Sequence, residues 1–533
     1  MIRRSFVTVV FAALVVASGA TQPRAPLTGT WEGQLLLNSN WRFMEADFGA
    51  TGKVADAKVD LPQERREFAE FSIDGQSVRW TLLRGQGRIR FEGTREDDVI
   101  RGRAEQNDVA GEFQLVRTAA STPRETAPYA ATYRTDGGDL ITVARFNFGD
   151  GVDRLALLDV RRGYWGTLLP TGRSEFLFAP ARSGRFPVAI RVAFGNDSGG
   201  RAMQVTLEGP DRERVVARRA DLYDTSDVTF ANGPVTLAGT TIRSHALGRR
   251  PAVVMVHSSG NQSRNGPNAY FRLIANVLAA NGITTLVYDK RGVADSTGSW
   301  PTATFDDLAG DLHAAIDAVR RVPGVDPTSI GIWSLSQGGW IAPLVAAMDE
   351  KLRFLVLVSA AATSPAQQEI ARVSAVMRAA GSPSADVAAA SNYLQMYFDV
   401  VAGTRPWSEL QAEMTSTASA PWLRYVPRPR TEREATWAPA PATLDPAAIL
   451  RDVRAPVLAV HGADDVDVPA SVNSALFARL SAHRNSRQEV FPSADHYVLV
   501  RITDPDREYR RLSPGYLPLL VDWIRDQSVG TAR

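Results

Sequence analysis

Residues 330–347 read IGIWSLSQGGWIAPLVAA, and this stretch decides how the second half of the chain folds. The residues before the serines predict a short buried strand, and the residues after the glycines predict the first turns of a packed helix. Ser336 lies in the turn between them. A sharp strand-to-helix turn exposes a serine hydroxyl at its apex and requires small residues two positions to either side. Gly338 meets that requirement, and Ser334 stands where glycine is usual.

The composition indicates a folded protein of several domains. The chain has 533 residues, which is too many for one ordinary core, so we expect two or three domains. Hydrophobic residues make up 44% and charged residues 22%, as in globular proteins. The net charge is +2 and the arginines are scattered among acids, which argues against nucleic-acid binding. The absence of cysteine excludes disulfides, thiolate nucleophiles and cysteine-ligated metals.

The N-terminus has the pattern of an export signal. Met1–Arg4 is basic, Ser5–Val16 is largely apolar, and Ala17–Ala20 supplies small residues suited to cleavage. The apolar stretch is short for a permanent membrane anchor, which remains the alternative, and no other segment is long and apolar enough to span a bilayer. We therefore predict residues 1–20 to be a signal peptide of a periplasmic or secreted protein with no stable membrane span.

Upstream of residue 225, short runs alternate polar and apolar residues and are separated by turn residues. Three of them are residues 29–35, 87–93 and 111–117. Alternation of this kind is typical of antiparallel sheets with one solvated face. Residues 121–128 are polar and contain proline, as in a linker. We predict two small all-β domains, barrels or sandwiches, at residues 26–118 and 126–224, without the repeat of a propeller.

After residue 225, strands alternate with helical patterns, which predicts a mostly parallel sheet covered on both faces. A leading hairpin is expected at residues 228–242, and further strands are expected at residues 252–257, 284–289, 330–333, 354–359 and 457–461. This domain is predicted to cover residues 226–533. An insertion at about residues 364–446 has helical apolar spacing in its first half and predicts a cap over the Ser336 turn.

Several motifs of this domain resemble those of the α/β-hydrolase superfamily, in the same order. They are the oxyanion-loop motif His257-Ser258-Ser259-Gly260, the Asp-x-Arg-Gly turn at residues 288–292, the nucleophile Ser336, the acidic loop at residues 462–469 and the histidine loop Ala494-Asp495-His496. The resemblance, to bacterial esterase-like serine hydrolases, covers rather more than half of the chain. It implies an α/β-hydrolase domain with a helical cap, preceded by one or two small all-β domains.

The predicted nucleophile needs a base, because a serine hydroxyl reacts slowly until its proton is removed. The chain has six histidines. His496 lies in a loop between a further predicted strand, at residues 488–491, and a terminal helix expected from Pro514, which suits a catalytic base. His257 and His461 each end a predicted strand before a turn, which suits structural roles.

The base in turn needs a carboxylate to hold its tautomer. Three acids follow the strand that ends at His461, and the spacing of the superfamily selects Asp465. Asp464 and Asp467 are expected to shape the loop or to face solvent. Asp495 is a poor candidate, because adjacent side chains usually point apart.

The oxyanion formed during acyl transfer needs backbone N–H donors that are already in place. One is expected from Gln337, directly after the nucleophile, and the other from Ser259. Ser258 stands where glycine is usual and would be strained if its φ were positive. Asp289 and Arg291 are expected to pin their own turn by hydrogen bonds, and we leave them outside the site.

The sequence therefore predicts an exported serine hydrolase that cleaves small carboxylic esters or related acyl substrates through an acyl-enzyme. No metal or organic cofactor is implied. A serine peptidase or aminopeptidase related to the prolyl-oligopeptidase group is one alternative. A surface- or glycan-binding protein with a degenerate hydrolase domain is the other.

Overall fold

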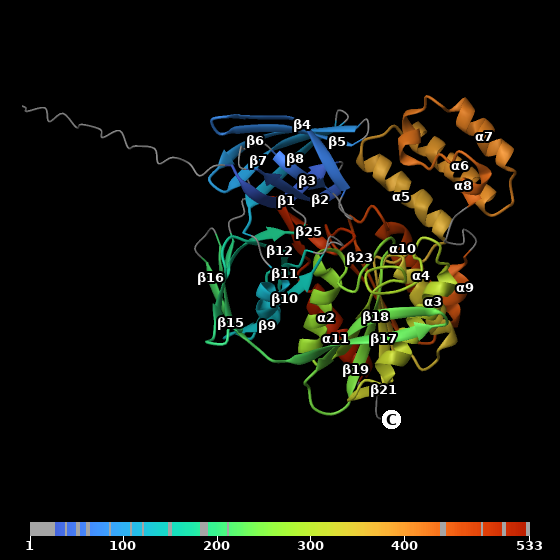
Figure 1. The fold of residues 1–533 in the computed structure, drawn as a ribbon. Helices are drawn as coiled ribbons and strands as arrows, with labels where there is room; N and C mark the ends of the chain where they lie inside the picture. The colour runs from blue at the N-terminus through green and yellow to red at the C-terminus, as the bar shows by residue number, and fades with distance from the viewer. Residues whose placement is uncertain are drawn as a thin grey trace, which may run out of the picture.

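The computed structural model describes residues 27–37, 40–49, 54–59, 64–84, 87–106, 109–119, 122–147, 152–181, 190–209, 213–436, 444–480, 483–503 and 508–528. The predicted signal peptide lies outside the described residues. Figure 1 shows two β-barrels, a large sheet with helices on its faces, and a separate group of cap helices. Within the described part of the chain, no helix has both the length and the hydropathy needed to cross a membrane.

The first barrel is antiparallel, follows chain order and closes where its first strand pairs with its last. Its strands are β1 Gly29–Leu37, β2 Asn40–Phe48, β3 Val54–Val59, β4 Glu64–Asp74, β5 Ser77–Arg84, β6 Gly87–Glu96, β7 Val99–Gln106 and β8 Val109–Arg117. Alternation places one side of each strand inside. There Trp80 stacks on Phe91 with ring centroids 4.8 Å apart, and Phe113 meets Trp80 edge-on at 5.0 Å. Large side chains therefore fill the interior.

The second barrel closes where β16 pairs with β9. Its strands are β9 Ala131–Thr135, β10 Leu140–Phe146, β11 Arg154–Asp159, β12 Tyr164–Pro170, β13 Glu175–Pro180, β14 Arg191–Asn196, β15 Ala202–Glu208 and β16 Arg214–Arg219. On β10, Ile141 and Val143 belong to the interior core. Ala144 and Phe146 belong to the core shared with the C-terminal domain. This barrel is therefore packed inside and, over part of its wall, outside as well.

The segment predicted as a linker contains one helical turn, α1 Pro123–Thr126, and a 3₁₀ turn, η1 Ala127–Tyr129. A buried ion pair also joins the two barrels. Arg154 of the second barrel lies 3.0 Å from Glu32 and 3.1 Å from Glu45 of the first. Removing one partner of such a buried group leaves an uncompensated charge, so the contact fixes how the barrels meet.

The C-terminal domain is built on one sheet with the strand order β17-β18-β20-β19-β21-β22-β23-β24. These strands are β17 Tyr223–Asn232, β18 Val235–Ser244, β19 Arg250–Val256, β20 Thr284–Tyr288, β21 Val325–Leu335, β22 Phe354–Val358, β23 Val457–Gly462 and β24 Arg487–Phe491. β17 and β18 form the leading hairpin and pair antiparallel, as does β18 with β20. All other neighbours pair parallel. The sheet begins at Tyr223, just before the predicted domain start at residue 226.

Helices cover both faces of this sheet (Figure 1). They are α2 Tyr270–Ala280, α3 Phe305–Arg320, α4 Gly338–Met348, α9 Pro446–Asp452, α10 Ala470–Leu480 and α11 Tyr516–Ser528. Val253 and Met255 pack on the face with α2 and α11, while Val254 and Val256 pack on the opposite face with α3 and α4. Strands buried on both faces read as continuous apolar runs. The predicted fold class, an α/β-hydrolase domain behind small all-β domains, is confirmed.

The predicted cap lies between β22 and β23 and is helical. Its elements are α5 Pro365–Ala379, α6 Ser384–Val401, α7 Trp407–Ser416, η3 Pro421–Tyr425 and α8 Glu432–Thr436. They share a small core of their own, in which Tyr393 meets Trp422 with ring centroids 5.4 Å apart. One further element was not predicted, a hairpin of β25 Leu499–Thr503 and β26 Glu508–Leu512 that follows the histidine loop.

Candidate active site

Ser336 lies at the apex of the turn between β21 and α4. Its φ is +55°, in the left-handed region that a non-glycine residue rarely adopts. The turn is held by two backbone hydrogen bonds, from Ser336 N to the Val358 carbonyl at 2.9 Å and from Gly339 N to the Ser336 carbonyl at 2.8 Å. Strain of this kind amounts to roughly 1–3 kcal/mol and concentrates at functional sites. The side chain is half-buried.

The neighbours of Ser336 are small because the turn leaves no room. A Cβ at Gly338 would lie 2.9 Å from the Ser334 Cβ and 3.0 Å from the His257 carbonyl. Since position 334 carries a side chain, position 338 must be glycine. Ser334 is fully buried and its hydroxyl has no hydrogen-bond partner. Ser334 is therefore a packing residue, with no base beside it to activate it.

Asp465 and His496 are brought together although 31 positions separate them in the chain. His496 Nδ1 donates to Asp465 Oδ2 over 2.9 Å. Asp465 Oδ1 accepts the backbone N–H groups of Asp467 at 2.9 Å and Val468 at 2.8 Å, so the buried carboxylate is fixed at both oxygens. Asp464 is exposed, and Asp465 is the acid that bonds His496 Nδ1.

The loop that carries His496 is shaped by the acid before it. Asp495 accepts the backbone N–H groups of Tyr497 at 2.9 Å and Leu499 at 3.0 Å, and its second oxygen pairs with Arg510 at 2.5 Å. A Cβ at Gly462 would lie 2.3 Å from the Ala494 carbonyl, so only glycine lets β23 approach this loop. Asp495 therefore has a structural role.

The electrostatics of the pair favour a basic imidazole. Burial by itself disfavours the charged ring, but the Asp465 carboxylate and its hydrogen bond, with Asp467 and Asp495 nearby, outweigh that effect and raise the pKa of His496 above 6.5. Because Nδ1 donates to Asp465, Nε2 is the nitrogen left to accept a proton. No hydrogen bond joins the Ser336 hydroxyl to His496 in this structure. Catalytic hydrogen bonds often tighten only when substrate binds.

His257 begins the predicted oxyanion loop and has a structural role. Its Nε2 donates to the Tyr288 carbonyl, and burial, helped by the Lys290 charge, lowers its pKa to about 3. The φ of Ser258 is not positive, so the backbone strain that a positive φ would cause there is absent. The residue of this loop with a positive φ, +79°, is Gly260. Ser259 is exposed and Gln337 is half-buried.

His461 also has a structural role at the end of β23. Its Nε2 donates to the Ala360 carbonyl over 2.9 Å, and its ring lies against Phe477. Burial lowers its pKa, so the ring stays neutral at physiological pH. Among the histidines that the sequence placed at strand ends, neither His257 nor His461 is available as a base.

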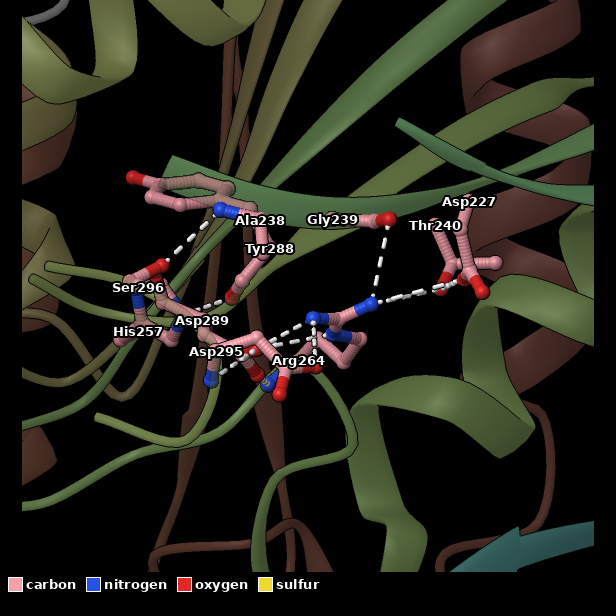
Figure 2. A network of polar contacts seen from close by, with 10 residues as sticks. All are labelled: Asp227, Ala238, Gly239, Thr240, His257, Arg264, Tyr288, Asp289, Asp295 and Ser296. Atoms are coloured by element: carbon pink, nitrogen blue, oxygen red, sulfur yellow. Dashed lines mark hydrogen bonds and ion pairs between the residues drawn. The ribbon is translucent and has the colours of Figure 1, made fainter. Parts of the chain in front are cut away.

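Figure 2 shows what holds the oxyanion loop against the sheet. Asp289 accepts from the Arg264 backbone N–H at 2.7 Å, from Nε at 2.9 Å and from Nη2 at 2.5 Å. Arg264 also donates to Asp295 at 2.8 Å and to the Gly239 carbonyl at 3.2 Å. Arg291 forms a two-pronged pair with Asp311, with both distances 2.7 Å. Asp289 and Arg291 thus engage the protein itself, and the sequence did not single out Arg264.

Among the described residues, three groups could offer ligand atoms to one metal ion, Asp465, Asp467 and His496, whose atoms lie within 4.8 Å of one another. Both Asp465 oxygens already accept hydrogen bonds, and His496 Nδ1 is committed to one of them. A metal would have to replace these bonds, so the arrangement suits an acid–base pair better than a metal site.

Residues 249–501 match the family model described as serine aminopeptidase, S33. A thiohydrolase, aneE, of Aspergillus aculeatus is 32% identical over 20% of this chain and 33% of its own length. A polyketide transferase, grgF, of a Penicillium species is 33% identical over 25% of this chain and 44% of its own length. The chain therefore spans less than half the length of these curated relatives. A solved structure of DcsB with its substrate analogue is 20% identical, covers 58% of this chain and 100% of its own, and has a TM-score of 0.38. The family match covers residues 249–501, which lie within the domain whose sheet order and helices give it an α/β-hydrolase fold.

Proposed function

We propose that this protein is a serine hydrolase that cleaves small carboxylic esters through an acyl-enzyme. One observation carries the proposal. Ser336 is held in a left-handed turn at the carboxyl end of β21, and the hydrogen-bonded Asp465–His496 pair follows the carboxyl ends of β23 and β24 in the same sheet. Carboxyl ends of parallel strands meet at one edge of a sheet, where such folds bind ligands.

Each step of the proposed reaction has a residue suited to it. The Ser336 oxygen attacks the ester carbonyl carbon while His496 Nε2 takes the hydroxyl proton. The backbone N–H groups of Gln337 and Ser259 bind the negative oxygen of the tetrahedral intermediate. The intermediate collapses to the acyl-enzyme, and the departing alkoxide takes the proton from His496. Water, deprotonated by His496, then attacks the acyl-enzyme, and the acid leaves as the proton returns to Ser336.

The cap supports a small acyl substrate, because it is tied to the acidic loop. Gln368 on α5 donates from Nε2 to the Asp467 carbonyl, and its Oε1 accepts from Asn473 at 3.2 Å. A cap anchored two residues from Asp465 limits access to the site and helps to exclude water. The names of the relatives, thiohydrolase and polyketide transferase, also describe acyl chemistry.

An aminopeptidase is the second candidate, favoured by the description of the matching family. Recognition of a substrate amine requires an acid that is free to face it. Asp467 is exposed and lies within 4.8 Å of the reacting pair, so it is the acid best placed for that task.

Turnover of model substrates tests the proposal and separates the two candidates. Purified protein is assayed with p-nitrophenyl acetate and butyrate, with an acyl thioester and with aminoacyl p-nitroanilides. We expect ester turnover, a fluorophosphonate adduct on Ser336 alone, and loss of both in Ser336→Ala. Equal ester turnover by parent and Ser336→Ala would refute the serine mechanism. Anilide turnover above ester turnover, lost in Asp467→Asn, would establish the aminopeptidase instead.

We also propose that the protein is exported, because residues 1–20 have the charge and hydropathy pattern of a cleavable signal. The full chain is expressed in a bacterium, the cells are fractionated, and the N-terminus of the product is sequenced. We expect a periplasmic or secreted protein shortened near Ala20. A full-length product in the cytoplasm would refute export.

A further inference from the structure

We infer that Lys290 is a positioning residue that orients the oxyanion hole by holding the peptide between Ser258 and Ser259 in one orientation. The inference rests on the proposed function, because it concerns the donors that stabilise the oxyanion. Lys290 lies between Asp289 and Arg291 in the turn after β20, and nothing in the sequence set it apart from its two charged neighbours.

The ammonium of Lys290 is buried and uses three donors on three acceptors. It donates to the Ser258 carbonyl at 3.0 Å, to the Gly260 carbonyl at 3.3 Å and to Gln337 Oε1 at 2.8 Å. The residue is 4% exposed. An ammonium has three donors, so its capacity is fully used. These acceptors lie on both sides of the predicted oxyanion hole.

The direction of the Ser259 N–H follows from the direction of the Ser258 carbonyl. The two groups belong to one planar trans peptide and point in opposite directions. While Lys290 binds the carbonyl, the Ser259 N–H must point away from the ammonium. If the peptide flipped, the carbonyl oxygen would replace the N–H and repel a developing oxyanion. The flip would also break the bond to Lys290, so the ammonium opposes it.

The residue that supplies the second donor is also bonded to the Lys290 ammonium. Gln337, whose backbone N–H is the other predicted donor, accepts from Lys290 through its side chain. One ammonium therefore spans the oxyanion loop and the start of α4. A charge on a peptide carbonyl also polarises the N–H of that peptide, which strengthens it as a donor.

The charged groups near Lys290 in the turn and in the oxyanion loop are bonded to other partners or are neutral. Among the described residues, no carboxylate lies within ion-pairing distance of its ammonium. The carboxylate of Asp289 is bonded to Arg264, Arg291 is bonded to Asp311, and His257 is neutral. Burial lowers the pKa of Lys290 to about 8. Its charge is therefore present at neutral pH and is lost as the pH rises through that value.

The pH profile distinguishes orientation by a charge from simple loop support. In the parent, kcat for p-nitrophenyl acetate is measured from about pH 6 to about pH 10, which brackets the ordinary titration ranges of histidine and lysine. We expect kcat to fall on the alkaline side, near the pKa of Lys290, with KM little changed. A residue that only supported the loop would leave kcat level until the protein unfolds.

Three variants complete the test. Lys290→Met removes the charge and the donors, Lys290→Arg keeps a charge that does not titrate in this range, and Lys351→Met removes an exposed lysine as a matched control. We expect kcat of Lys290→Met to fall about 100-fold, the effect of losing one oxyanion donor, and its alkaline decline to vanish. Lys290→Arg should recover part of kcat and move the decline upward, and Lys351→Met should match the parent.

The outcomes separate the inference from the proposed function. Circular dichroism and complete labelling of Ser336 by a fluorophosphonate show that each variant is folded. A folded Lys290→Met with kcat within about twofold of the parent, against the expected loss of a donor, would refute the inference alone. The inference would also be refuted if kcat of Lys290→Met or Lys290→Arg declined at alkaline pH as it does in the parent. It would equally be refuted if kcat of the parent stayed level at alkaline pH. A parent that neither turns over the ester nor reacts at Ser336 would refute the proposed function, and the inference with it.

Discussion

Replacing Asp289 by alanine removes the anchor of the oxyanion loop without touching a group that contacts substrate. The Asp289 side chain is 1% exposed and that of Arg264 is 12% exposed. The other two acids that face Arg264, Asp295 and Asp227, are 77% and 85% exposed. In Asp289→Ala, the guanidinium therefore stays mostly buried, and the two acids left to pair with it lie in water (Figure 2).

The expected loss of stability follows from these burials. Removing one partner of a buried ion pair costs about 3–5 kcal/mol, because the other charge is left uncompensated. The Arg264 backbone N–H also loses its acceptor. Asp289→Asn keeps that acceptor and loses the charge, so we expect about 2 kcal/mol, the size of a hydrogen bond to a charged group. Asp295→Ala should cost at most about 1 kcal/mol, as exposed pairs do.

Urea unfolding followed by tryptophan fluorescence measures these free energies, and ester turnover reports the loop. We expect kcat of Asp289→Ala to fall with its stability, because Arg264 no longer ties the oxyanion loop to the turn after β20 and keeps only its contacts with β18 and the exposed acids. The double variant Arg264→Met, Asp289→Ala removes the orphan charge and should be more stable than Asp289→Ala. If Asp289→Ala and Asp295→Ala were equally stable, or if the two substitutions simply added, a buried pair could not be the anchor.

Three further predictions concern the reacting pair and its surroundings. Asp465→Asn offers an N–H to His496 Nδ1, which imposes the wrong tautomer, and kcat/KM for esters should fall by about 10⁴; an unchanged value would exclude Asp465 as the orienting acid. Because the Asp465 carboxylate raises the pKa of His496, the base is protonated at a higher pH than an ordinary histidine. We expect kcat/KM to fall about tenfold per pH unit below that pKa, and a level acid limb would exclude His496 as base. Trp165→Ala should destabilise the protein by about 3–5 kcal/mol and should also lower kcat. Trp80→Ala, in the first barrel, should destabilise the protein by a similar amount and leave kcat of the folded enzyme unchanged. Equal kcat values for the two variants would show that Trp165 does not act on the site.

The sequence predicted the residues of the candidate site because each lies in a short local pattern. The Ser336 turn needs small residues within two positions, and the acid and the histidine follow strands that are apolar throughout. Such signals are contained in a few consecutive residues. The strain at Ser336, the choice of Asp465 over Asp464 and the neutral state of His257 then follow from how those few residues pack.

Contacts between distant segments left no such signal. Lys290 meets Ser258 and Gln337, 32 and 47 positions away, and Arg264 meets Asp289 across 25 positions. A lone lysine in a turn and a lone arginine in a loop read as solvated charges. Alternation likewise predicts strands but not closure, because the pairing of β1 with β8 is decided by the whole sheet.

The role of the second barrel emerges only from these long-range contacts. Three consecutive residues of the second barrel lie against the loop that carries His496 and the hairpin that follows it. The Gly163 carbonyl accepts from Leu512 N at 2.9 Å, and Tyr164 meets Tyr509 with ring centroids 5.7 Å apart. Trp165 lies 6.1 Å from Tyr497, the residue after His496, again between centroids.

On its other side, the same loop is held by the hydrolase domain. The Tyr270 hydroxyl of α2 donates to the Tyr497 carbonyl at 3.0 Å, and the Trp165 ring lies 4.9 Å from that of Tyr270. Trp165 Nε1 also donates to the Asn268 carbonyl at 2.9 Å, just before α2. The loop carrying His496 is thus packed between α2 and the barrel wall. Because buried aromatic pairs of this kind stabilise the surfaces that they join, the second barrel helps to fix the position of the loop that carries His496.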